Sequence, residues 1–73
     1  MSVYVSFIQD RHTDPEIFVF SDRQKALDHT RRYFTEVVAH PERIAEQPCE
    51  PYLLFLEYTL ESDYAFCIEC PIL

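Results

Sequence analysis

The sequence contains no glycine and no asparagine, the two residues that most readily adopt left-handed backbone conformations. Without glycine, the chain cannot form the glycine-rich loops that hold phosphate groups in nucleotide-binding proteins. Turns that need a positive φ angle must use other residues, and Asp and Ser are the remaining candidates. These absences exclude the common nucleotide-binding motifs.

Basic residues are also few, because six Lys and Arg stand against thirteen Asp and Glu, for a net charge of −7. A bare nucleic-acid-binding surface needs clustered basic residues, so we expect no direct contact with nucleic acid. The charges are segregated, with a sum of −3 over residues 1–22, +2 over 23–40 and −6 over 41–73. No apolar stretch reaches the ~18 residues of a membrane helix, and no secretory leader is visible. We therefore expect a cytoplasmic protein without membrane contact.

Three cysteines are an odd count, which makes a disulfide framework improbable in this setting. Cys67 and Cys70 have C-x-x-C spacing, but in a strand such residues point to opposite faces and lie about 10 Å apart. No second pair of cysteines or histidines accompanies them. The sequence thus predicts free thiols, with no metal and no cofactor, and leaves a metal or redox module on Cys67 and Cys70 as an alternative.

The 73 residues allow one domain, 1–73, and a hydrophobic content of 48% argues against disorder. Strands are predicted over 3–8 and 17–20, where β-branched and aromatic residues dominate. Ser21 and Gln24 fit a capping box, which predicts a helix that begins with Ser21 as its N-cap and ends before Pro41. A short second helix is possible over 41–47, with Pro41 in its first turn.

The C-terminal segment predicts a hairpin of two strands, 52–60 and 64–70. A three-residue loop over 61–63 pairs Leu56 with Ile68, whereas a two-residue loop would place Glu69 opposite Leu56 and break the apolar face. In the preferred loop, Asp63 takes the left-handed position that such loops usually give to glycine.

Together these elements predict an α+β fold: a four-stranded antiparallel sheet with one main helix on one face, in the order ββαββ. The side of the sheet away from the helix would carry much apolar surface, and monomers seldom leave such a patch exposed. Either long side chains and the segment 41–51 cover it, or it is a surface for a partner, most simply a second copy. The predicted dimer face consists of Tyr4, Ile8, Leu53, Phe55 and Thr59.

The hairpin segments 3–5 and 17–20 lead into Ser21-Asp22-Arg23-Gln24-Lys25-Ala26, an aromatic–Ser–x–Arg–x–Lys–Ala helix entry. In this layout the chain resembles a group of small microbial and phage proteins that lack a known activity. The resemblance implies a small accessory protein of a mobile element, and it transfers no functional residues.

No catalytic constellation is visible, since His12, His29 and His40 are scattered and have no nucleophile at an interpretable spacing. We therefore expect no enzyme, but a small acidic protein-interaction module that forms a homodimer through its sheet. The alternative is a phage-type inhibitor, similar to anti-CRISPR proteins, whose acidic surface mimics nucleic acid and binds a basic host protein. That surface would consist of Glu42, Glu46, Glu50, Glu57, Glu61, Asp63 and Glu69.

Overall fold

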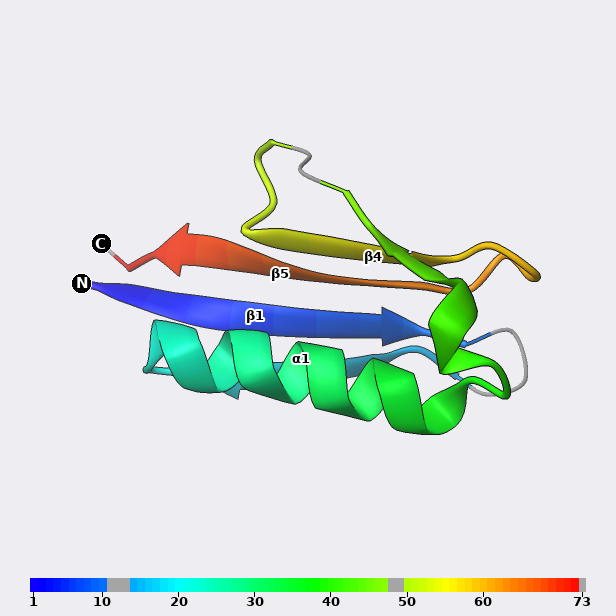
Figure 1. The fold of residues 1–73 in the computed structure, drawn as a ribbon. Coiled ribbons are helices and arrows are strands. Elements are labelled where there is room, and N and C mark those ends of the chain that lie inside the picture. Colours follow the sequence, from blue (N-terminus) through cyan, green and yellow to red (C-terminus); the bar gives the residue numbers. More distant parts are fainter. Residues whose placement is uncertain (11–13, 48–49, 73) are drawn as a thin grey trace.

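The computed structural model describes residues 1–10, 14–47 and 50–72. One antiparallel sheet of five strands carries one long helix on one of its sides (Figure 1). The elements are β1 (Ser2–Gln9), β2 (Glu16–Phe20), α1 (Arg23–Val37), the 3-10 helix η1 (Pro41–Arg43), β3 (Ile44–Glu46), β4 (Leu54–Tyr58) and β5 (Tyr64–Pro71). The α+β class is confirmed, with five strands in place of the predicted four.

The additional strand replaces the predicted helix over 41–47. Only the turn Pro41–Arg43 is helical, and Ile44–Glu46 then pairs with β4, with Ile44 opposite Tyr58. In this position the strand covers the outer backbone edge of β4, which would otherwise be exposed. The side chain of Ile44 also packs against the core, so burial favours the strand over another helical turn.

The strand order is β2-β1-β5-β4-β3, which places the first and the last strand of the chain side by side at the centre (Figure 1). Strands β1 and β5 pair over their whole length, from Ser2 opposite Pro71 to Gln9 opposite Tyr64. The sheet is therefore complete only when both ends of the chain are in place.

The helix begins one residue later than the capping box predicts. Asp22 is the N-cap, and its side chain accepts a hydrogen bond from the backbone N–H of Lys25 at 3.1 Å. Ser21 is exposed and precedes the cap. A carboxylate accepts from a backbone N–H more strongly than a hydroxyl and also interacts favourably with the positive end of the helix dipole.

Replacing the cap tests this assignment. We expect Asp22→Ala to lower the free energy of unfolding by about 1 kcal/mol, because one N–H of the first turn loses its acceptor. Ser21→Ala is the matched control and should change it by less than about 0.5 kcal/mol. Urea denaturation of both variants gives the two values, and a larger effect at Ser21 would contradict the observed cap.

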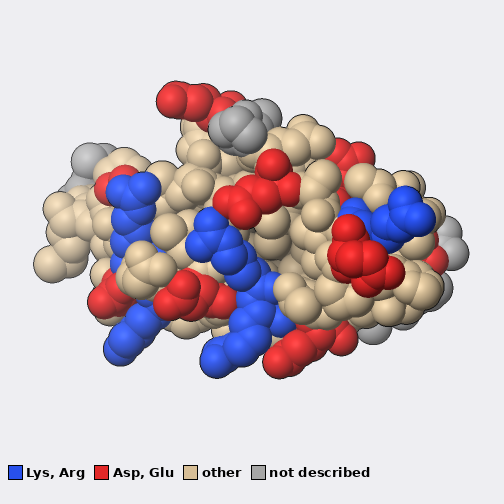
Figure 2. All heavy atoms as spheres, in the orientation of Figure 1, with Lys and Arg blue, Asp and Glu red and all other residues tan. Residues whose placement is uncertain are grey.

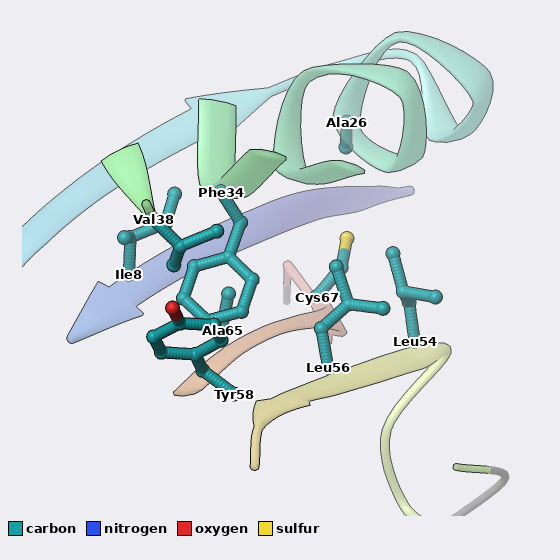
Figure 3. Packing of buried hydrophobic residues seen from close by; sticks show 9 residues of the cluster. All are labelled: Ile8, Ala26, Phe34, Val38, Leu54, Leu56, Tyr58, Ala65 and Cys67. Carbon is teal, nitrogen blue, oxygen red and sulfur yellow. The ribbon is translucent and has the colours of Figure 1, made fainter. Parts of the chain in front are cut away.

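Small side chains let the helix approach the two central strands closely. Ala26 and Thr30 of α1 are fully buried, as are Ser6 on β1 and Ala65 and Cys67 on β5. Larger residues complete the core where α1 extends over β4, and Phe34 points from the helix toward Tyr58 and Ala65 (Figure 3). The buried apolar residues are Ile8, Ala26, Phe34, Val38, Leu54, Leu56, Tyr58, Ala65 and Cys67.

Three polar contacts fix the position of α1 over the sheet. At the centre, hydrogen bonds join the Thr30 hydroxyl to the Ser6 hydroxyl (2.6 Å) and to the carbonyl oxygen of Ala26 (2.8 Å). At one edge, Arg31 forms a 2.8 Å ion pair with Glu46 of β3. At the other edge, the Tyr33 hydroxyl donates to the carboxylate of Glu16 on β2 at 2.6 Å. The helix is thus held at the middle and at both edges.

The contact at Tyr33 predicts a pH dependence of stability. The hydrogen bond to Glu16, together with burial, raises the pKa of the Tyr33 hydroxyl above its ordinary value of 10.0. A pKa that is raised in the folded state adds stability below the pKa of the unfolded state, and this contribution is lost as the pH rises through the folded value.

We expect Tyr33→Phe to lower the free energy of unfolding by about 1 kcal/mol at neutral pH, because one hydrogen bond to a carboxylate is lost. The difference between wild type and variant should shrink above about pH 10. Urea denaturation at neutral pH and at alkaline pH checks this, and a constant difference across that range would contradict it.

The C-terminal hairpin has a different register from the predicted one. Phe55 lies opposite Phe66 and Leu56 opposite Ala65, and the loop consists of the four residues 59–62. No described residue has a positive φ angle, so Asp63 does not take a left-handed position. Since the chain has no glycine, a four-residue loop avoids the strained conformation that a three-residue loop requires. The shift also places small Ala65 and Cys67, rather than Phe66 and Ile68, beneath the helix.

Candidate functional site

The side of the sheet opposite α1 is the most distinctive surface of the described chain, and we call it the open face. Directly paired residues of neighbouring strands share a side, so the printed register assigns its members from the buried Ser6 and Ile8, which point the other way. The open face consists of Val3, Val5, Phe7, Gln9, Ile17, Val19, Ala45, Phe55, Glu57, Tyr64, Phe66, Ile68 and Cys70.

Aromatic rings form a continuous cluster on the half of this face built by β1, β5 and β4. The Phe7 ring stacks on Phe66 at 5.0 Å between centroids, and the Phe55 ring is parallel to Tyr64 at 6.0 Å. Tyr52, from the segment before β4, lies against Phe55 and Phe66 at 5.3 and 4.7 Å. Tyr52 thus covers part of the cluster, as the prediction of a covering segment anticipated in part.

The other half of the open face is aliphatic and extends to the edge strand β2. Ile17 and Val19 are 62% and 63% exposed, far more than the apolar residues of the central strands. They continue two rows of the sheet, because Ile17 is opposite Phe7 and Val19 is opposite Val5. The apolar surface therefore reaches from the aromatic cluster to the edge of the sheet.

Glu57 is the only acidic or basic side chain among the open-face residues. Its carboxylate accepts a 3.3 Å hydrogen bond from the side-chain amide of Gln47, and Tyr64 lies opposite it on β5. Beside it is a hollow of about 380 Å³ at the hairpin end of the sheet. Its lining consists of Phe55, Glu57, Glu61, Ser62, Asp63 and Tyr64.

The structure divides the predicted dimer face between the two sides of the sheet. Phe55 lies on the open face, and Leu53 is half-buried just before β4. Tyr4 and Ile8 instead point toward α1, and Ile8 is in the core. Thr59 lies beyond β4, where its hydroxyl donates to the carbonyl oxygen of Arg43 at 2.9 Å.

The register shift explains why the prediction misplaced Ala65 and Cys67 on the open side and missed Phe7, Tyr64 and Phe66. One sequence signal could have found them. In 64–67, aromatic and small residues alternate, and a closely packed helix requires the small ones beneath it.

The seven residues of the predicted acidic surface are spread over several parts of the fold. Glu46 is in an ion pair with Arg31, Glu42 lies 3.3 Å from His40, and Asp63 is buried. Glu57 lies on the open face, whereas Glu69 is on the opposite side of the sheet. On the face that carries α1, Lys and Arg alternate with Asp and Glu (Figure 2).

Cys67 and Cys70 lie on opposite faces of β5. Cys67 is opposite Ser6 in the core, and Cys70 is opposite Val3 on the open face. Burial raises the pKa of the Cys67 thiol, and a hydrogen bond with Thr30 acts in the opposite sense to a smaller extent. Among the described residues, no three His, Cys, Asp or Glu side chains form a group that could hold a metal ion. Cys49 lies outside the described residues.

We expect Cys67 to resist alkylation in the folded protein, because the reactive species is the thiolate and the core excludes the reagent. Its modification by iodoacetamide should be at least about tenfold slower in the native state than in urea, as measured by peptide mass spectrometry. Equal rates in the two conditions would show that Cys67 is accessible.

The three histidines do not come together into a site. His29 packs among the rings of Phe18, Phe20 and Tyr33, and its Nε2 atom is buried without a hydrogen-bond partner in the described part of the chain. His40 is exposed, and His12 lies outside the described residues. No helix of the described chain is long and apolar enough to cross a membrane.

Comparison with protein-family models, with curated proteins and with solved structures yields no match to this chain. Its function must therefore be argued from its own surfaces.

Proposed function

We propose that the chain is a protein-interaction module that forms a homodimer through the open face of its sheet. The observation that carries this proposal is a continuous apolar surface, aromatic on β4 and β5 and aliphatic on β2, with one charged side chain. Aromatic residues are enriched in the cores of protein interfaces, and charged residues are depleted there.

The size of the open face fits a small dimer. With about 3.4 Å of rise per residue and about 4.8 Å between strands, its strands cover roughly 470 Å² in projection. Two copies bring about 950 Å² together, and the relief of the side chains increases the accessible area further. This value lies near the lower end for specific interfaces, where about 1,000 Å² is needed, so we expect a dimer of micromolar affinity.

Charge favours a second copy over a basic partner at this surface. The chain carries a net charge of −7, yet among the open-face residues only Glu57 is charged. Two copies can therefore meet here with little repulsion between their interface residues. A basic protein would find little charge complementarity on this face, and the acidic residues elsewhere are interrupted by Arg and Lys (Figure 2).

The charge-insertion variant Phe55→Glu tests the dimer, because it buries a carboxylate in the aromatic cluster only when two copies associate. We expect wild type to sediment as a dimer at micromolar concentration and Phe55→Glu to be a monomer, with Kd raised at least about a hundredfold. Val37→Glu is the matched control, since Val37 is an exposed apolar residue on α1, and it should leave the dimer intact.

Circular dichroism of both variants checks that they remain folded. A wild-type protein that is monomeric at high micromolar concentration would refute the homodimer. So would a Phe55→Glu variant that dimerises as tightly as wild type.

A further inference from the structure

Glu57 occupies a position that gives the proposed dimer a sensitivity to pH. Its side chain lies one row from the stacked Phe55 and Phe66, so contact between two open faces removes water from its carboxylate. Within the interface each copy contributes one such group. Removing a carboxylate from water disfavours its charged form.

The surroundings of Glu57 reinforce this effect. From β3 and the residue after it, Ala45 and the amide of Gln47 face it, and from β5 the Tyr64 ring faces it. Glu61 and Asp63 line the same hollow, and both are acidic. No Lys, Arg or His lines that hollow among the described residues, so nothing there offsets a second negative charge.

We propose that dimerisation of this chain is coupled to proton uptake at Glu57, so that the dimer becomes tighter as the pH falls. This inference rests on the proposed homodimer. On association, each Glu57 carboxylate gains one proton from solvent, and the neutral group can still accept the hydrogen bond from Gln47. At higher pH both carboxylates are charged, and they must be desolvated beside each other.

The Kd of the dimer, measured by sedimentation at constant ionic strength from about pH 8 to about pH 5.5, tests the coupling. If protonation at each of the two sites is favoured tenfold by association, Kd falls about a hundredfold across this range. Glu57→Gln should dimerise at least as tightly as wild type at low pH, and its Kd should not change with pH.

The general loss of negative charge near the pI of 4.7 also promotes association, and a matched variant separates this effect. Glu69→Gln removes one carboxylate on the opposite side of β5 and changes the net charge by the same amount. It should keep the pH dependence of wild type.

The possible outcomes distinguish the coupling from the dimer itself. A wild-type dimer whose Kd is constant with pH overturns the coupling and leaves the homodimer in place. A pH dependence that survives in Glu57→Gln, or is lost equally in Glu69→Gln, also overturns it. A protein that is monomeric at every pH overturns both proposals.

Discussion

The close packing of α1 on β1 and β5 is the constraint on which the rest of this structure depends. It requires small side chains at the contact, and Ala26 of the helix with Ser6, Ala65 and Cys67 of the strands provide them. Because side chains alternate along a strand, small residues on one side of β5 leave the large ones, such as Phe66, on the other. The aromatic open face is therefore a consequence of how tightly the helix packs.

Polar contacts then select one position for the helix on this smooth contact. Small apolar side chains alone would let a helix slide, whereas the Thr30–Ser6 hydrogen bond fixes the centre and the contacts of Arg31 and Tyr33 fix the two edges. Each contact is worth little by itself, about 1 kcal/mol. Together they relate three strands to one helix, and so they also define which side of the sheet stays open.

The distribution of charge follows from the same architecture. The helix surface, the strand edges and the loops carry nearly all charged side chains, because both sides of the central strands are apolar. A net charge of −7 at the periphery favours solubility, while the nearly uncharged open face permits association. Glu57 is the exception, and its location at the margin of the aromatic cluster connects the two properties.

The local pattern of the sequence determined the α+β class, the N-terminal hairpin, the extent of the main helix and its end before Pro41, because these depend on periodicity and on backbone restrictions of single residues. The tertiary structure alone decided the strand order, the third strand at 44–46 and the register of the C-terminal hairpin. These depend on what packs against each segment: β4 needed an edge partner, and the helix needed small residues beneath it. Since a register shift by an odd number of residues exchanges the two sides of a strand, that one decision moved Phe66 to the open face and Cys67 into the core.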